Sequence, residues 1–122
     1  MKNNIAQELI VTKRGELLNT QCPSRNLLHR ITQKWSLLIF LSLHDKTMRF
    51  SELRRNIDGI SEKMLAKTLQ MLEEDGFITK KSYPVIPPHT EYSLTELGLD
   101  FFQRVVLLCD WVESNYQKTS PH

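Results

Sequence analysis

A tight glycine-containing turn between two short amphipathic segments constrains the fold more than any other feature of this sequence. The segment SELRRNI, from Ser51 to Ile57, is followed by DGI and then by SEKMLAKTLQMLEED, which ends at Asp75. Ser51 and Ser61 each stand where a helix N-cap is expected, and Gly59 can adopt the left-handed conformation that ends a helix. Two short helices joined in this way are typical of a helix-turn-helix.

The second of these segments has an apolar face and a polar face. Leu65, Leu69 and Leu72 follow the spacing of one helix face. The side chains that fall on the opposite face are Lys63, Lys67, Gln70 and Glu74. Two lysines four residues apart repel each other along a helix and cost a few tenths of a kcal/mol. Such a pair indicates either a plain solvated face or a face directed at an anionic partner.

A β-hairpin is predicted directly after the second helix. The segments FITKKSY and TEYSL are rich in β-branched and aromatic residues and read as strands. The connecting PVIPPH contains three prolines, which stiffen the loop and suppress pairing within it. A hairpin in this place is the wing of a winged helix. Lys80, Lys81 and His89 lie in or beside it.

Double-stranded DNA is the partner that these elements fit together. A duplex offers phosphates to both helices and the hairpin, and its major groove admits the second helix. We expect base contacts from the first half of that helix and phosphate or minor-groove contacts from the helix before it and the hairpin. Glu62, Glu73 and Glu74 weigh against this interpretation. The candidate DNA-binding residues are Arg54, Arg55, Ser61, Glu62, Lys63, Lys67, Gln70, Lys80, Lys81 and His89.

A long C-terminal helix, about residues 95–117, is predicted to form a homodimer. Thr95 is its N-cap candidate. The helix is apolar around so much of its circumference that it must be covered on more than one side, and a second subunit is the simplest cover. The candidate interface residues are Phe101, Phe102, Val105, Leu108, Cys109 and Val112. A dimer would place two recognition helices on two half-sites of the duplex.

The N-terminal half supplies a helix start and a core helix. Pro23 fits the first position of a helix that runs to about Ile31, and KWSLLIFLSLH suits a buried helix. Cys22 precedes that first helix, where the N-terminal dipole favours a thiolate, although position alone favours a structural thiol over a reactive one. Residues 1–21 form an extension that could hold one short helix. The fold class is therefore mainly α with a small β-hairpin wing, and residues 22–122 form one winged-helix domain.

Composition excludes several classes of protein. The net charge of 122 residues is only +2, but residues 22–89 carry eleven basic and seven acidic side chains. No apolar run approaches the roughly 18 residues of a membrane span, and no signal peptide is apparent, so we expect a cytoplasmic protein with free thiols. The histidines and cysteines show no zinc-ligand spacing, so we expect neither a metal nor another cofactor. No nucleophile–base pair suggests an enzyme.

The chain from about Cys22 to Glu113 resembles the HxlR-type bacterial regulators, winged-helix repressors related to MarR. The matching pieces are CP at Cys22, KWSLLIFLSL, RFSELRRNIDGISEKMLAKTLQMLEEDGFI, YPVIPPHTEYSLTELG and LCDW. The resemblance implies a homodimeric transcription regulator with Glu62 to Asp75 as recognition helix and Phe77 to Leu94 as wing. It also implies a dimer built by the terminal helices. Several family members sense electrophiles or oxidants through the cysteine that Cys22 matches.

The resemblance has one departure, and one rival function stays open. ITQKW stands where the family usually has a Gly-Gly pair before Lys-Trp. A winged helix can also serve as a protein–protein interaction module without DNA binding. That alternative predicts an apolar exposed face on the second helix, whereas Lys63, Lys67 and Gln70 are polar.

Overall fold

The computed structural model describes residues 17–121, which divide into two compact units. The first unit ends at Gln33 and contains helix α2, Pro23–Thr32. The second unit begins at Lys34 and contains every other helix and strand named below. Of the N-terminal extension predicted over residues 1–21, the part up to position 16 lies outside the described residues.

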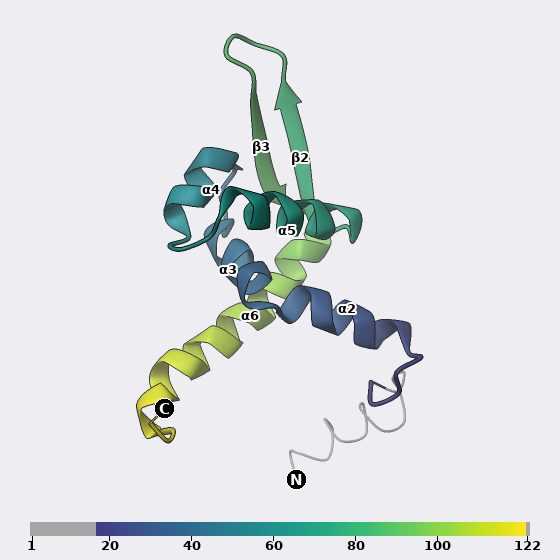
Figure 1. Ribbon diagram of the computed structural model, residues 1–122, viewed down its shortest axis with the longest axis vertical. Coiled ribbons are helices and arrows are strands. Elements are labelled where there is room, and N and C mark those ends of the chain that lie inside the picture. The colour runs from purple at the N-terminus through teal and green to yellow at the C-terminus, as the bar shows by residue number, and fades with distance from the viewer. Residues whose placement is uncertain (1–16, 122) are drawn as a thin grey trace. The chain divides into compact units, whose positions relative to one another are not determined.

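The second unit is a three-helix core with a small antiparallel sheet and a long C-terminal helix (Figure 1). Its elements in chain order are α3 Lys34–Ser42, β1 Met48–Arg49, α4 Phe50–Asn56, α5 Glu62–Glu74, β2 Ile78–Tyr83, β3 His89–Leu94, α6 Glu96–Asn115 and the 3-10 helix η2 Tyr116–Lys118. The sheet order is β1-β3-β2, with Met48 opposite Tyr92 and Tyr83 opposite His89. The predicted fold class, mainly α with a hairpin wing, is confirmed.

The core of this unit forms where α3 meets α5 and α6. Phe40 is fully buried, and its ring lies 5.7 Å from Phe77 and 5.0 Å from Phe101, both in edge-to-face contact. Burying one such side chain contributes about 1.5–3 kcal/mol to stability. Leu65 and Leu69 of α5 complete this core, as the apolar spacing of that helix predicts.

Two of the three predicted helix caps are confirmed and one is wrong. The Ser61 hydroxyl accepts from the Met64 N–H at 3.0 Å, and the Thr95 hydroxyl accepts from the Gly98 N–H at 3.0 Å. Helix α4, however, starts at Phe50 with Arg49 as its N-cap, not at Ser51. The Glu52 carboxylate accepts from the Arg49 N–H at 2.8 Å. This bond satisfies a backbone donor at the helix start, and the N-cap lies two residues earlier than predicted.

Candidate nucleic-acid interface

Helices α4 and α5 meet through a turn that is buried on one side and polar on the other. Ile57 and Ile60 bury the inner side of the turn. Gly59 has φ +86°, a conformation that L side chains rarely adopt, so the turn depends on glycine. The Asn56 amide donates to the Ser42 hydroxyl at 2.9 Å and fixes the end of α4 against α3. The turn and the end of α4 are therefore fixed against the core.

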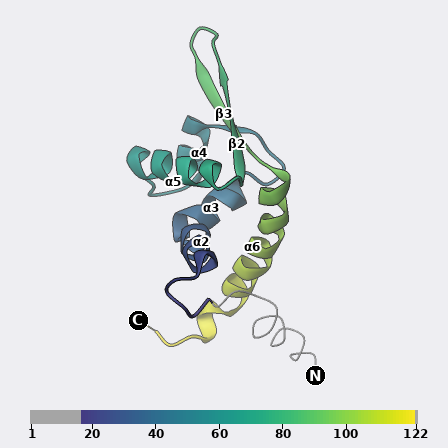
Figure 2. The same ribbon diagram turned by 90° about the vertical axis from the view of Figure 1, so that its right-hand side faces the viewer.

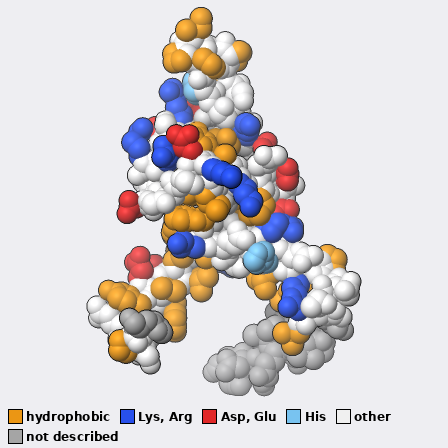
Figure 3. Space-filling view, viewed as in Figure 1, with side chains coloured by type: hydrophobic (Ala, Val, Ile, Leu, Met, Phe, Trp, Pro, Cys, Tyr) orange, Lys and Arg blue, Asp and Glu red, His pale blue; other side chains and the backbone are white. Residues whose placement is uncertain are grey.

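The outer face of α5 is polar and exposed, as the sequence predicts. The exposed candidates on this helix and its cap are Ser61, Glu62, Lys63, Lys67 and Gln70. Gln70 donates to Glu74 at 3.2 Å along the helix. Figure 3 shows Lys and Arg side chains gathered over α4, α5 and the hairpin stem. This face can meet an anionic surface with several cations at once.

Arg54 and Glu62 form an ion pair across the turn. The Arg54 Nη1 donates to the Glu62 Oε2 at 2.9 Å, and both side chains are well exposed. An exposed pair of this kind contributes only about 0–1 kcal/mol to stability. The pair therefore links the first residue of α5 to α4 without being a strong stabilising contact. Sequence reasoning named both residues but missed their pairing, because they are eight residues apart and on different helices.

Hairpin β2–β3 places its basic residues on both of its faces. Because side chains alternate along a strand, Lys80 and Lys81 point to opposite sides. Lys80 lies beside Glu73 and Glu74 of α5 around a small hollow. The ammonium of Lys81 lies 5.2 Å from the Tyr83 ring centroid on the outer side. The sequence cluster of two lysines is therefore divided in space.

His89 and Tyr83 close the hairpin at its outer end. The two rings stack with centroids 4.8 Å apart, and the imidazole Nε2 lies 3.3 Å from the Glu91 carboxylate. His89 is half-buried by these contacts. On the other face, burial raises the pKa of Tyr92, and the nearby Glu73 adds to the effect, so this phenol stays neutral.

Helix α6 divides its apolar residues between the subunit core and the surface. Phe102 and Val105 are buried, and the Phe102 ring stacks on His44 at 4.6 Å. These two predicted interface residues are already covered within the subunit and have little surface left for a partner. Phe101 packs in the aromatic core, whereas Leu108 and Val112 are exposed and Cys109 is partly exposed. The exposed apolar residues of the second half of α6 are Leu107, Leu108, Trp111, Val112 and Tyr116.

Cys22 is the N-cap of α2, which begins at Pro23 as predicted. Its sulfur lies 2.8 Å from the Ser24 hydroxyl oxygen. Arg25, three residues on, donates to the Leu18 carbonyl oxygen at 3.0 Å. The structure thus adds Ser24 to the surroundings of this thiol.

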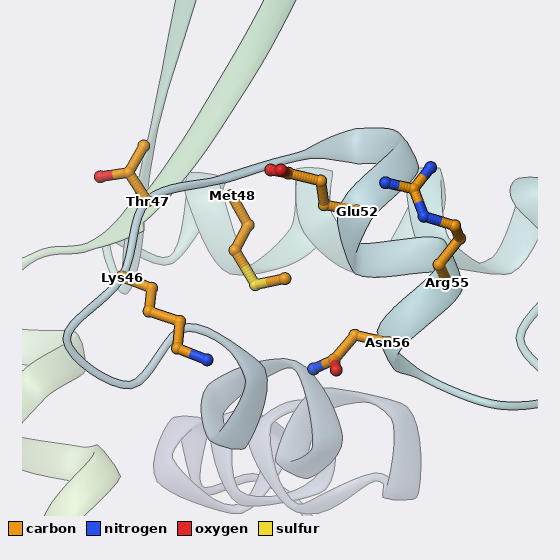
Figure 4. A pocket seen from close by; sticks show the side chains of 6 residues that line it. All are labelled: Lys46, Thr47, Met48, Glu52, Arg55 and Asn56. Atoms are coloured by element: carbon orange, nitrogen blue, oxygen red, sulfur yellow. The ribbon is translucent and has the colours of Figure 1, made fainter.

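A polar pocket of about 560 Å³ opens beside α4 (Figure 4). Lys46 and Met48 line it from the loop and strand after α3, and Glu52, Arg55 and Asn56 line it from α4. The pocket has no nucleophile with a neighbouring base. Within residues 17–121, no three His, Cys, Asp or Glu side chains form a group that could hold a metal ion. In the same part of the chain, no helix is long and apolar enough to cross a membrane.

Comparison with known proteins gives consistent matches. Residues 30–120 match the family model described as HxlR-like helix-turn-helix. The HTH-type transcriptional regulator YtfH of Escherichia coli is 51% identical over 92% of this chain and 86% of that protein. The solved structure of the transcriptional regulator ytfH from Salmonella typhimurium is 52% identical, with a TM-score of 0.82 over 86% of this chain and 94% of that chain. The redox regulator HypR in its oxidized form is 38% identical, with a TM-score of 0.71 over 77% of this chain and 97% of that chain.

Proposed function

Because the chain belongs to the HxlR-like helix-turn-helix family of transcriptional regulators, with structural neighbours in the MarR family, we propose that it acts in the cytoplasm as a homodimer on two DNA half-sites. It is a regulator and not an enzyme. Helix α5 enters the major groove, and α4 and the hairpin hold the flanking backbone.

The exposed polar face of α5 is the observation that carries this proposal. A protein-docking helix would present an apolar face, but Met64 is the one large apolar side chain exposed on α5. Lys63 and Lys67 are both exposed beside it. Cations held four residues apart on a helix repel each other in water, and phosphate or guanine acceptors reduce this repulsion. The observed face therefore favours nucleic acid over a protein partner.

The Arg54–Glu62 pair supports separate roles in DNA binding, with Arg54 on the backbone and Glu62 on a base. In the free protein these two side chains satisfy each other. On DNA, Arg54 can move to a phosphate, and Glu62 is released to accept from a cytosine amino group. Because an exposed ion pair contributes little to stability, breaking it for this exchange costs little free energy. Ser61, Lys63, Lys67 and Gln70 complete the reading face, and Arg55, Lys80, Lys81 and His89 contact the backbone or minor groove.

Selection of duplexes from a random library, followed by gel shifts, tests the DNA assignment. Lys63→Ala should change base preference at one position by about 1–3 kcal/mol. Lys81→Ala should weaken binding to all sequences alike. It should also lower the slope of log affinity against log salt concentration by about one for each phosphate that the lysine no longer neutralises. Lys118→Ala, an exposed lysine on η2, is the matched control and should change neither quantity. If Lys63→Ala weakens every sequence equally, direct readout by that lysine is wrong, and if wild type selects nothing, the DNA-binding proposal fails.

Cys22 is the proposed site at which an electrophile or oxidant changes DNA affinity. Its position at a helix N-terminus favours the reactive thiolate, and the Ser24 hydroxyl 2.8 Å away can donate to that thiolate. A relative of the chain, HypR, is a redox regulator. Modification of Cys22 would alter the start of α2 and, through the terminal helices of the dimer, the distance between the two DNA-binding units.

A further inference from the structure

The tip of hairpin β2–β3 is apolar and projects into solvent. The tip consists of residues 84–88, which are Pro84, Val85, Ile86, Pro87 and Pro88. Ile86 is 99% exposed and Val85 is 49% exposed. Figure 3 shows this apolar cap at the end of the hairpin, with basic side chains below it on the stem. None of the roles assigned above uses Val85 or Ile86.

The tip is held rigidly by the residues beneath it. Tyr83 and His89 face each other as the last pair of the two strands, and their rings stack at 4.8 Å. The Lys81 ammonium and the Glu91 carboxylate flank this stack from the same hairpin. Three of the five tip residues are prolines, whose φ angles are fixed. Ile86 is thus presented with little conformational entropy left to lose on binding, which favours insertion into a narrow site.

The charge around the tip favours a polyanion as the partner. Residues 76–90 contain no Asp or Glu, and they contain Lys80, Lys81 and His89. Glu91, the next residue, pairs with Lys81 across the hairpin and lies 3.3 Å from His89, so one carboxylate stands against the two lysines of the stem. An apolar tip on a stem of this sign can approach a phosphate backbone without repulsion.

The size of the tip favours DNA over a protein surface. A stable protein interface buries about 800 Å² on each partner and involves about 20–30 residues, which is far more than a tip of five residues presents. The minor groove of DNA is only about 6 Å wide. Proteins that bind there frequently insert an Ile, Leu, Met, Phe or Pro side chain between neighbouring base pairs and kink the duplex. Ile86, between Val85 and Pro87, is of the right kind and size for this.

We propose that Ile86 is an apolar wedge that enters a base step from the minor groove and bends the DNA at the wing. This inference deepens the proposed function and rests on it. A wedge separates stacked bases, and pyrimidine–purine steps unstack most easily. The hairpin tip therefore selects a flexible step, such as TA or CA, by its deformability and not by hydrogen bonds or charge.

The test measures bending and step preference together. A duplex selected by the wild type carries fluorophores at its two ends for energy transfer and 2-aminopurine at the step beside the wing. Wild type should bend it by at least about 20° and brighten the 2-aminopurine by unstacking it. Ile86→Ser should lose the bend and the brightening and weaken binding about tenfold, the usual effect of one unfavourable base pair. Ile86→Leu should retain all three.

Three controls make the outcome decisive. Ile86→Lys adds a charge at the tip, so it should keep affinity through phosphate contact while losing the bend and the brightening. Leu18→Ala removes an equally exposed apolar side chain from the other unit and should change nothing. Replacing a TA step beside the wing by a stiff AA step should weaken DNA binding by wild type about tenfold and leave DNA binding by Ile86→Ser unchanged.

The results separate this inference from the function on which it rests. If Ile86→Ser bends and unstacks DNA as wild type does, the wedge is overturned while sequence-specific binding stands. If the tip instead binds a protein, Ile86→Ser should bind, bend and unstack DNA as wild type does, and this result also overturns the wedge. If wild type binds no duplex selectively, the proposed function fails as a whole and the wedge fails with it.

Discussion

At the scale of single residues, the two cysteines lie in contrasting surroundings. Cys22 caps α2 beside the Ser24 hydroxyl. Burial raises the pKa of the Cys109 thiol, and the carboxylates of Glu113 and Asp110 raise it further. Cys109 is partly exposed. Because the thiolate is the reactive form, we expect both burial and the carboxylates of α6 to slow the reactions of Cys109.

This contrast predicts that Cys22 reacts first and carries the response to oxidants. Wild type and Cys22→Ser should bind the selected duplex equally when reduced, and diamide or a quinone should change the affinity of wild type alone. Mass spectrometry after brief alkylation should find the label at Cys22 before Cys109, and more alkylation of Cys109 only as pH rises. Cys109→Ser is the matched control and should respond as wild type does.

A response that Cys22→Ser shares with wild type would remove the sensing role from this residue. Labelling of Cys109 before Cys22 at neutral pH would contradict the ordering of the two thiols. Neither result would touch the assignment of α5 to DNA.

Single caps show how far sequence alone determined local structure. Ser61 and Thr95 are caps as predicted, since each is the first hydroxyl before a periodic helix. Ser51 satisfies the same pattern, yet α4 begins earlier because Glu52 reaches the Arg49 N–H. Two positions for the start of α4 are possible there, and the pairing of β1 up to Arg49 decides between them. That pairing partner is about forty residues away along the chain, so no local pattern could reveal it.

At the scale of elements, the start of α6 is fixed by close contacts with the two residues that lead into β2. The Thr95 hydroxyl donates to the Gly76 carbonyl oxygen at 2.7 Å, and the Thr95 N–H donates to the Phe77 carbonyl oxygen at 3.0 Å. One turn into the helix, Gly98 is buried against the same backbone. A Cβ built on Gly98 would lie 2.1 Å from the Phe77 oxygen.

Gly98→Ala should therefore destabilise the protein, although the same change in a helix normally stabilises it by about 0.5–1 kcal/mol. The backbone oxygen of Phe77 cannot swing away as a side chain can, so α6 or β2 must shift. We expect a loss of about 1–3 kcal/mol, the usual cost of overpacking a core. Urea unfolding should show a lower midpoint with an unchanged slope.

Ser114→Ala, at an exposed position of the same helix, is the control and should change stability by less than about 0.5 kcal/mol. A Gly98→Ala variant as stable as wild type would contradict the close packing of α6 on β2.

The division of α6 between core and surface is the part of the fold that its sequence did not settle. The sequence makes this helix apolar around most of its circumference, and nothing in the periodicity says which side the subunit itself covers. The structure buries Phe102 and Val105 and leaves Trp111 exposed. The reason is length, because α6 has 20 residues and α3, on which it packs, has nine. In contrast, α5 has one stripe, and its buried and exposed faces were both predicted.

At the scale of the whole molecule, the second half of α6 presents an apolar surface that a lone subunit leaves in water. Figure 2 shows α6 continuing well past α3. Leu107 is 70% exposed and Trp111 is 62% exposed, and Leu108, Val112 and Tyr116 are each about half exposed. A contiguous patch of this kind marks an interaction site in a protein of ordinary composition.

The last prediction is that this patch holds a homodimer and that the dimer is needed for tight DNA binding. Burying the exposed parts of five apolar side chains on each subunit contributes on the order of 10 kcal/mol. Association costs about 4–15 kcal/mol, so the dimer depends on most of the patch and one buried charge should break it. Wild type should sediment at micromolar concentration with about twice the chain mass of 14.3 kDa. Leu107→Glu should sediment as a monomer, whereas Gln103→Glu, at an exposed polar position on α6, should remain dimeric.

DNA length then separates dimerisation from folding. Two recognition helices on one dimer should meet major grooves about 34–36 Å apart. Wild type should bind a duplex with two half-sites at that spacing far more tightly than one with a single half-site. Leu107→Glu should bind both duplexes with the same weak affinity, because its α5 is intact and only the linkage between half-sites is removed. A wild type that is monomeric at micromolar concentration would leave the α6 patch to another partner and remove the two-half-site arrangement, while a Leu107→Glu variant that still distinguishes the two duplexes would place the dimer contact elsewhere in the chain.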